Sequence, residues 1–465
     1  MSLIKSISGF RGTIGGKPGA GLSPVDVVKF TAAFATYIKE KNPEKKCVII
    51  VGRDARISGP MVNHLVLGTL MGMGVNVIDT GLSTTPTVEM AVVEAKADGG
   101  IILTASHNPK HWNALKLLNS TGKFINAEEG QRVLELADKN DFDFADVTDL
   151  GQCSLDTTTI DMHIQKVLSL PLVNKAAIAQ ANFKVAIDAV NSTGGIAIPK
   201  LLKALGVKDI VAMYCDPTGE FPHNPEPLPE NVTEICDKVV KEQCHVGFVV
   251  DPDVDRLAII CENGAMFGEE YTLVSIADYI LQHTPGNTVS NLSSTRALRD
   301  ITEKYNQKYA AAAVGEVNVV AKMKETNAII GGEGNGGVIY PELHYGRDAL
   351  VGIALFLSHL AEQKCKVSDL KYALPDYVIS KNKIELTPDI DVDLILKSIA
   401  ERYKMYEVTT IDGVKIDLEN EWIHLRKSNT EPIIRIYSES NSIAKAEHLA
   451  KTIMENIGEI VRANL

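Results

Sequence analysis

A predicted strand runs into a polar loop in the segment Gly100-Ile101-Ile102-Leu103-Thr104-Ala105-Ser106-His107-Asn108-Pro109. Its first four residues are apolar, which is typical of a strand buried inside a sheet. The loop that follows is rich in hydroxyl and amide groups, and His107 stands beside Ser106. Open α/β sheets usually bind their ligands at the carboxyl ends of strands. The segment therefore predicts an α/β fold with its chemistry at this loop.

A second segment has the same arrangement. The apolar run 246–250 precedes Asp251-Pro252-Asp253-Val254-Asp255-Arg256. Because side chains of alternate residues project the same way, the three aspartates can converge on one cation. Carboxylates and a phosphate oxygen form the oxygen-only shell that suits Mg²⁺. The two segments together indicate a phosphorylated serine held by a divalent metal.

Each segment also has a simpler interpretation. The hydroxyl and amide groups around Ser106 can merely satisfy the hydrogen bonds of a turn. The aspartate segment can be compared with an EF-hand calcium loop, with Glu262 at the twelfth position. Arg256 stands where that loop needs glycine, and the flanking runs are strand-like instead of helical, so the EF-hand is disfavoured.

Length and composition limit the class of protein. A chain of 465 residues is too long for one core and predicts three or four domains. The net charge of -12 argues against a nucleic-acid partner. We find no bilayer-spanning apolar stretch and no signal peptide, and therefore expect no membrane association. The seven cysteines have no zinc spacing and favour small buried hydrophobes in a reducing cytoplasm.

Strand-like and helical patterns alternate through most of the chain and predict βαβ units. Ser23 and Pro24 begin a helix over 24–41, and the charged loop 53–56 follows a strand. The alternation restarts twice, which predicts three α/β units. Their expected strands are 47–51, 75–78 and 100–103, then 183–188, 210–214 and 246–250, then 257–261, 288–291, 309–314 and 328–330. Residues 407–437 instead predict antiparallel strands flanked by helices, an α+β module behind a linker at 372–376.

Two further loops carry ligand chemistry. Residues 332–337 frame Glu333 and Asn335 with glycines, which suits sugar hydroxyls. A dinucleotide site there is disfavoured because no helix opens at the motif, and an ordinary glycine turn is the simpler alternative. Residues 426–435 combine Arg426 and Arg435 with hydroxyl and amide groups, which is typical of a phosphate site. The alternative there is a solvated hairpin tip.

Arg11 lies in a Ser-Gly-Phe-Arg-Gly segment, and Lys116 lies ten residues after Ser106. Each side chain can neutralise a transferring phosphoryl group or handle a proton, or can be ordinary surface charge.

Taken in order, these motifs resemble those of the α-D-phosphohexomutase superfamily over essentially the whole chain. The order is Ser-Gly-x-Arg-Gly, Thr-Ala-Ser-His-Asn-Pro, Asp-x-Asp-x-Asp-Arg, a Gly-Glu sugar loop and Arg-x-Ser-x-Thr-Glu-Pro. The resemblance implies three mixed α/β domains and a C-terminal α+β domain of the TATA-binding-protein type, around a central cleft. We expect the domains at 1–152 (phosphoserine loop), 153–257 (metal loop), 258–373 (sugar loop) and 374–465 (phosphate site).

The resemblance also implies roles for individual residues. Ser106 would carry the phosphoryl group, and the three aspartates with the serine phosphate would bind Mg²⁺. Arg11, His107 and Lys116 would serve proton transfer and phosphoryl contact. Substrate contacts would come from Arg256, Glu333, Asn335, Arg426, Ser428, Asn429, Thr430 and Arg435.

The implied reaction interconverts a hexose 6-phosphate and a hexose 1-phosphate through a hexose 1,6-bisphosphate, which would serve as intermediate and activator. Many bacterial relatives carry Gly-Glu-x-Ser-Gly-His in the sugar loop. Asn335 stands in place of that serine, which is similar to archaeal mutases and to mutases of amino-sugar phosphates. We therefore expect a mutase of glucosamine phosphate, with glucose or mannose phosphate as the alternative. A further departure, Gly315-Glu316, leaves one substrate contact of the family open.

The expected partner is a small sugar phosphate, and the expected state is a monomer or a homodimer. Two other classes of function stay open at this point. One is a metal-dependent phosphatase with the same serine and aspartates, and the other is a sugar-phosphate binding protein without catalysis. We also expect the C-terminal domain to close over the substrate.

Overall fold

The computed structural model describes residues 2–6, 9–385, 391–427 and 433–464. The chain forms two compact units. The first unit comprises Met1–Thr272 and Asn335–Lys371, and the second comprises Leu273–Gly334 and Tyr372–Leu465. Three sheets of α/β type precede one antiparallel sheet, which confirms the predicted fold class.

The first sheet has seven strands in the order β1-β2-β6-β5-β3-β4-β7. Strands β3, β4, β5 and β7 are parallel, whereas β1, β2 and β6 add antiparallel pairs at the other edge. The bounds are β1 Leu3–Ser6, β2 Gly9–Thr13, β3 Val48–Arg53, β4 Asn76–Leu82, β5 Gly99–Leu103, β6 Trp112–Asn119 and β7 Cys153–Leu155. The strand after the serine loop therefore returns antiparallel, so the loop lies at the tip of the β5–β6 connection.

Alternate residues of the central strands serve two apolar layers. Ile49 in β3 packs in one core with residues of α1 (Pro24–Lys41), α2 (Gly59–Gly72) and α4 (Ala127–Lys139). Ile50 points to the opposite face and packs with α3 (Thr85–Glu94). Ser23 caps α1, as predicted from the sequence, and the structure adds a capping box between Ser23 and Asp26.

The second sheet belongs to the same unit and has the order β11-β10-β8-β9. Its strands are β8 Lys184–Asp188, β9 Asp209–Met213, β10 Val246–Val250 and β11 Leu257–Cys261. The expectation that 257–261 begins the third α/β unit is wrong, because β11 pairs antiparallel with β10. The six residues between them allow a hairpin, whereas a parallel crossover needs a dozen or more.

Helices cover both faces of this second sheet. Residues of α8 (Thr233–Lys241) form a core with one face. Phe356 of α12 (Ala349–Gln363) contacts the rings of Phe248 and Phe267. The other helices of the unit are α5 Thr159–Leu168, α6 Lys175–Ala181, α7 Gly194–Leu205, η1 Pro229–Asn231 and α13 Val367–Tyr372, with strand β15 at Gly337–Ile339.

The second unit contains a parallel sheet with the strands in the order β13-β12-β14. The bounds are β12 Asn287–Asn291, β13 Tyr309–Ala312 and β14 Ala328–Glu333. The helices are α10 Ala297–Lys304 and α11 Glu316–Thr326, while α9 Glu269–His283 crosses from the first unit's segment into the second.

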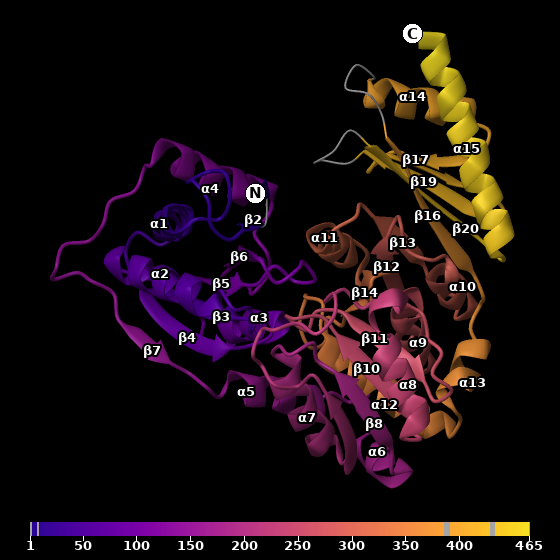
Figure 1. Cartoon of the computed structure of the whole chain (residues 1–465), viewed down its shortest axis with the longest axis horizontal. Coiled ribbons are helices and arrows are strands. Elements are labelled where there is room, and N and C mark those ends of the chain that lie inside the picture. The colour runs from indigo at the N-terminus through magenta and orange to yellow at the C-terminus, as the bar shows by residue number, and fades with distance from the viewer. Residues whose placement is uncertain (1, 7–8, 386–390, 428–432, 465) are drawn as a thin grey trace. The chain divides into compact units, whose positions relative to one another are not determined.

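The C-terminal sheet is antiparallel throughout, with the order β16-β20-β19-β18-β17. Its strands are β16 Val378–Glu385, β17 Glu407–Thr409, β18 Val414–Asp417, β19 Trp422–Lys427 and β20 Ile433–Ser440. Helices α14 (Val392–Arg402) and α15 (Ile443–Asn464) share an apolar core with this sheet (Figure 1). The predicted α+β module is confirmed, although its edge strand β16 was not predicted.

Within the described ranges, none of the helices combines enough length and apolar character to cross a membrane.

Candidate active site

The serine loop (residues 104–109) begins where β5 ends. Ser106 is buried and has a φ of 49°, a left-handed conformation that is unusual for a residue with a side chain. The Thr104 hydroxyl accepts a hydrogen bond from the Ser106 amide at 2.9 Å and donates one to Asp54 at 2.7 Å. Such a conformation persists only where neighbours enforce it, so the loop is held for a purpose beyond chain reversal.

Arg56 supplies most of that restraint. Its side chain is completely buried and forms an ion pair with Asp54, with Nε 3.0 Å from Oδ2. The guanidinium also donates hydrogen bonds to four backbone carbonyls of the serine loop and its exit, namely those of Ser106, Asn108, Pro109 and Trp112, over 2.5 to 3.0 Å. One fork-shaped cation therefore fixes the path of the whole loop.

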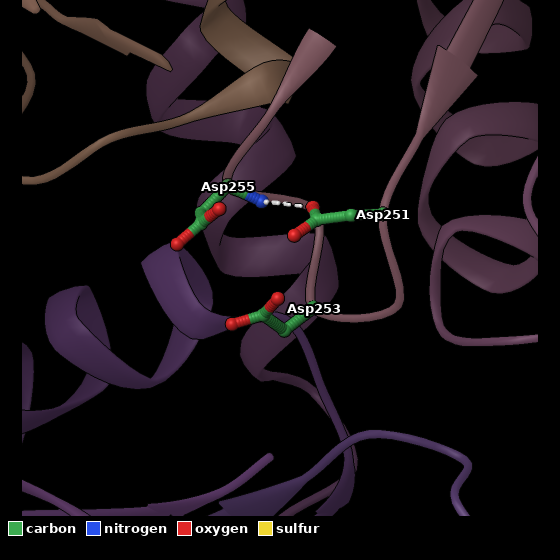
Figure 2. A group of neighbouring side chains, drawn as sticks. All are labelled: Asp251, Asp253 and Asp255. Carbon is green, nitrogen blue, oxygen red and sulfur yellow. Dashed lines mark hydrogen bonds between the residues drawn. The ribbon is translucent and has the colours of Figure 1, made fainter. Parts of the chain in front are cut away.

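The aspartate triad, Asp251, Asp253 and Asp255, follows β10. All three side chains are fully buried, and each offers an oxygen within 4.8 Å of the others (Figure 2). Asp251 Oδ1 accepts hydrogen bonds from the amides of Asp255 and Arg256, both at 3.2 Å. This turn back onto Asp251 directs the three carboxylates to one point, and a metal ion could bind there.

Two oxygens of the aspartate triad are further evidence that a cation could bind there. Asp253 Oδ1 and Asp255 Oδ1 are buried and have no hydrogen-bond partner among the described residues. Buried carboxylate oxygens are normally paired, because desolvation of a charge without a partner is costly. A divalent ion would satisfy both oxygens.

The serine and the triad meet within the first unit. Ser106 Oγ donates a hydrogen bond to Asp251 Oδ2 at 2.7 Å, although the two residues lie 145 positions apart. Lys116 Nζ in β6 donates to Asp253 Oδ2 at 2.7 Å and lies 3.7 Å from Asp255 Oδ2. The structure thus brings together the predicted phosphoryl carrier, the predicted metal ligands and a buried ammonium group.

Four further hydrogen bonds hold the triad and its loop in place. The Thr85 hydroxyl at the start of α3 donates to Asp253 Oδ2 at 2.6 Å. Arg347 donates to Asp255 Oδ2 at 2.7 Å. The carbonyl of Pro252 accepts hydrogen bonds from two hydroxyls that precede α7, those of Ser192 and Thr193.

The electrostatic environment separates the pKa values of the triad. Burial and the charges of Asp255 and Asp253 raise the pKa of Asp251 well above its usual range. Burial also raises the pKa of Asp253, but the Lys116 ammonium outweighs burial, and the resulting pKa lies below the usual value. Without a bound cation, Asp251, the carboxylate nearest the serine, therefore accepts a proton more readily than Asp253.

The remaining predicted catalytic residues surround Ser106. His107 Nδ1 lies 3.3 Å from Ser106 Oγ. Burial and the charge of Arg256 lower the pKa of His107 to about 2, which keeps its ring neutral. Arg11 donates to the Asn108 side chain at 3.1 Å, and Arg256 forms an ion pair with Glu226 at 3.3 Å. Arg11 and Arg256 thus add positive charge near the serine loop, and the neutral His107 adds a hydrogen-bonding group beside the serine.

The two predicted sugar-binding residues serve different local structures. Glu333 ends β14 and accepts hydrogen bonds from Asn291 at 2.9 Å and from the Gly315 amide at 3.0 Å. Asn335 Oδ1 accepts a hydrogen bond from the Gly337 amide at 3.2 Å and so shapes the glycine turn. Gly336 has a φ of 82°, and a Cβ there would lie 2.4 Å from the Leu257 carbonyl oxygen, so that position requires glycine.

The predicted phosphate site lies in the C-terminal sheet. Arg426 and Arg435 are directly opposite each other on β19 and β20. Arg426 Nε lies 3.0 Å from Asp412, and Arg435 is exposed. Like charges in register repel unless an anion lies between them, so the pair suits a phosphate. The predicted Ser428, Asn429 and Thr430 lie outside the described residues.

Sequence reasoning missed four residues that shape this site: Asp54, Arg56, Thr85 and Arg347. The sequence predicts the loop 53–56 only as the end of a strand, although a charged pair directly behind the apolar strand β3 is a usable signal. Arg347 stands next to the residue that caps an apolar helix, and no spacing pattern connects it with the aspartates. Thr85 carried no signal of its own.

Family comparisons agree with this geometry. Residues 3–144, 161–264 and 268–377 match the families described as phosphoglucomutase/phosphomannomutase, alpha/beta/alpha domains I, II and III. Residues 381–456 match the phosphoglucomutase/phosphomannomutase C-terminal domain. The chain therefore belongs to the phosphoglucomutase/phosphomannomutase family of the α-D-phosphohexomutase superfamily, whose members are mutases. The family resemblance predicted from the motifs is confirmed.

Individual relatives span nearly the whole chain. A phosphoglucomutase/phosphomannomutase from Thermococcus kodakarensis is 34% identical over 91% of this chain and 92% of its own. A phosphoglucosamine/phosphogalactosamine mutase from Sulfurisphaera tokodaii is 32% identical over 99% of both chains. Among solved structures, a phosphoglucomutase/phosphomannomutase family protein from Burkholderia thailandensis shares the fold, with a TM-score of 0.84, 24% identity and coverage of 99% of this chain and 98% of its own.

Proposed function

We propose that this chain is a Mg²⁺-dependent phosphohexomutase that interconverts hexose 6-phosphate and hexose 1-phosphate through a phosphoserine at Ser106. The observation that carries the proposal is the hydrogen bond of 2.7 Å between Ser106 Oγ and Asp251, inside a buried cluster of three carboxylates. A serine that merely satisfied a turn would not need three desolvated acids beside it.

The residues at the site fit a hard divalent cation. Asp251, Asp253 and Asp255 would hold the ion, with the serine phosphate as a further ligand, and Mg²⁺ when bound supplies Lewis-acid stabilisation of phosphoryl oxygens. The two triad oxygens without a hydrogen-bond partner support this assignment. Sodium, being monovalent, would leave more of the triad's charge uncompensated.

The chain's own groups supply the rest of the chemistry. Phospho-Ser106 donates its phosphoryl group to the free hydroxyl of a hexose monophosphate, and Ser106 later accepts the other phosphoryl group of the resulting 1,6-bisphosphate. Lys116, Arg11 and Arg256 stabilise the charge that develops in each transfer. His107, whose Nδ1 lies 3.3 Å from Ser106 Oγ, is the candidate for proton transfer at the serine.

The distal phosphate would bind between Arg426 and Arg435. Both ends of the sugar must take turns at the serine, so a second phosphate site has to hold the end that does not react. The cross-strand pair of guanidinium groups provides that charge on a rigid sheet. The proposed contacts to this phosphate come from Arg426 and Arg435. They also include Ser428, Asn429 and Thr430, which lie outside the described residues.

The preferred substrate in this proposal is glucosamine phosphate. Asn335 has the amide side chain expected opposite a 2-amino group, and the Sulfurisphaera tokodaii relative is named for amino-sugar phosphates. The alternative is glucose or mannose phosphate, which the name of the Thermococcus kodakarensis relative supports. Hexose 1,6-bisphosphate would be the activator, and the enzyme would act in the cytoplasm as a monomer or homodimer, without nucleic-acid or membrane partners.

The decisive experiment is an assay of four 6-phosphates, those of glucosamine, N-acetylglucosamine, glucose and mannose. It is run with Mg²⁺ and a trace of the matching 1,6-bisphosphate, and both 1-phosphate formation and phosphate release are measured. We expect isomerisation faster than hydrolysis, highest for glucosamine 6-phosphate, and a phosphorylated peptide containing Ser106. The Ser106→Ala variant should lose isomerisation, whereas Ser154→Ala on the exposed strand β7 should keep it.

Other outcomes decide between the alternatives. Phosphate release faster than isomerisation would select a metal-dependent phosphatase. A wild-type protein without turnover, together with a Ser106→Ala variant of unchanged sugar-phosphate affinity, would select a binding protein. If glucosamine 6-phosphate were the poorest substrate, the assignment of Asn335 would be wrong.

A further inference from the structure

A buried polar cluster lies beside the aspartate triad in the first unit. It consists of His163, His344, Asp348 and Glu89. His163, Asp348 and Glu89 are at most 1% exposed, and the His344 side chain is 12% exposed. Buried networks of this kind are costly unless their members are paired, so their presence in a core points to a defined task.

The two histidines bridge two helices. His163 Nδ1 lies 2.8 Å from the Thr87 hydroxyl in α3, and its Nε2 lies 2.9 Å from Asp348 Oδ2. His344 Nδ1 lies 3.3 Å from Glu89 Oε2 in α3, and its Nε2 lies 3.3 Å from the same Asp348 oxygen. Asp348 is the N-cap of α12, whose amides at 350 and 351 donate to Oδ1. Both rings thus connect α3 to the start of α12.

The starts of these two helices hold the metal loop from two sides. At the start of α3, the Thr85 amide donates to the Asp253 carbonyl at 2.9 Å, and its hydroxyl donates to the Asp253 carboxylate at 2.6 Å. At the start of α12, the Ala349 amide donates to the Val254 carbonyl at 3.2 Å, and Arg347 donates to the Asp255 carboxylate at 2.7 Å. The distance between α3 and α12 therefore sets the spacing of Asp253 and Asp255.

Charge makes the bridge rigid. Neither carboxylate oxygen of Glu89 has a hydrogen bond of good geometry among the described residues, and His344 is the cation that pairs with it. Burial alone would lower the pKa of His344, but Asp348 and Glu89 raise it to about 10, so the ring carries its charge at neutral pH. A Cβ at position 346 would lie 1.8 Å from Glu89 Oε2, which shows how closely the chain wraps this pair.

We propose that His163 and His344 are positioning residues for the cation site. Their contacts link the start of α3 to the start of α12. These links keep Thr85 in contact with Asp253 and Arg347 in contact with Asp255. The inference rests on the proposed function only in that the cation serves phosphoryl transfer. Its structural content, the spacing of the metal ligands, is testable without any turnover.

The test measures cation affinity directly. Full-length wild type, His163→Gln and His344→Gln are titrated with Mn²⁺, and free Mn²⁺ is followed by electron paramagnetic resonance. The melting temperature of each protein is recorded alongside. The matched control is His359→Gln, which removes another buried histidine from α12 itself. We expect about 10-fold weaker Mn²⁺ binding for His163→Gln and His344→Gln, in keeping with the effect of outer-shell changes at metal sites, and no change for His359→Gln.

Activity adds a second measurement. If the histidines act by positioning, the Mg²⁺ concentration for half-maximal rate rises in both variants, and the rate recovers at saturating Mg²⁺. A lower melting temperature with unchanged Mn²⁺ affinity would overturn the proposal, because it would reveal a purely structural role. If His344→Gln does not fold, the shape-conserving Thr87→Val variant, which removes the hydroxyl partner of His163, should still weaken Mn²⁺ binding, and unchanged affinity there would overturn the proposal too.

The experiment separates this inference from the proposed function. A wild type that binds Mn²⁺ at the triad but catalyses no isomerisation contradicts the proposed function and leaves the affinity comparison valid. An active mutase whose variants bind Mn²⁺ as tightly as the wild type contradicts the inference alone. Loss of Mn²⁺ binding in Asp251→Ala establishes that the titration reports the triad.

Discussion

Replacing Arg56 with methionine tests how the serine loop is held. Methionine keeps much of the apolar bulk but removes the guanidinium. That change leaves Asp54 buried beside Thr104 without its cationic partner, and it removes the donors for four loop carbonyls. The left-handed conformation of Ser106 then loses its main restraint.

The expected cost follows from these contacts. Breaking a buried ion pair by removing one partner costs about 3–5 kcal/mol. Each carbonyl left without a donor adds roughly 1 kcal/mol, reduced where water or protonation of Asp54 compensates. We therefore expect the free energy of unfolding of the first unit to fall by at least ~4 kcal/mol. Since whole domains are stable by only about 5–15 kcal/mol, the Arg56→Met protein would be marginal.

Amide hydrogen exchange measured by mass spectrometry over residues 99–119 provides the assay, because it reports local opening of β5 and β6. Arg132→Met is the matched control, since Arg132 is partly exposed and paired with Glu40 at the surface. Exposed pairs of this type contribute about 0–1 kcal/mol. If the two variants protected residues 99–119 equally, within about 1 kcal/mol, the restraint assigned to Arg56 would be refuted.

Three further predictions concern charge. Lys116→Met removes the buried ammonium beside Asp253, so turnover should fall roughly 10²–10³-fold, and unchanged turnover would count against its part in stabilising the transferred phosphoryl group. Arg435→Met should raise the KM for sugar phosphate about 10-fold without loss of stability, because it also relieves repulsion with Arg426; an unchanged KM would remove Arg435 from the phosphate site. Burial lowers the pKa of His424 from 6.5 to about 4. Between these pH values the unfolded chain binds a proton at His424, whereas the folded second unit does not. The unfolding free energy of that unit should therefore fall by up to about 3 kcal/mol as the pH drops from 6.5 to 4. Urea titrations followed by Trp422 fluorescence in a Trp112→Phe background, where Trp422 is the only tryptophan, should show no such pH dependence for His424→Gln.

Local patterns predicted most of the elements. The N-cap at Ser23 and the apolar runs at β3, β5 and β10 are visible in neighbouring residues, and the structure contains each of them. The assignment of β11 to a third α/β unit was wrong because an apolar run predicts a strand but does not show which strand it pairs with. The local signal for the antiparallel hairpin is the connection of six residues behind β10, which is too short for a parallel crossover.

The serine loop and the aspartate triad were also predicted from patterns among neighbouring residues. Ser106 and the aspartates follow apolar strands, and strand ends are where α/β sheets carry chemistry, so each loop was recognisable alone. The buried partners of these loops were not recognisable. Arg56, Thr85 and Arg347 lie far in the sequence from the loops that they contact and approach them only in the folded chain. Asn335 was recognisable from the sequence as a proposed contact to sugar. The structure adds a second role, because its side chain accepts a hydrogen bond from the Gly337 amide of the turn.

The amino-acid sequence alone determined the class of fold, the order of the loops and the family, because periodicity, capping and motif order are properties of residues close together in the chain. Tertiary structure alone decided that Ser106 touches Asp251, that Lys116 and Arg347 hold the triad, and that two histidines join α3 to α12. These contacts depend on how sheets and helices pack, and burial then sets the charges that the contacts carry.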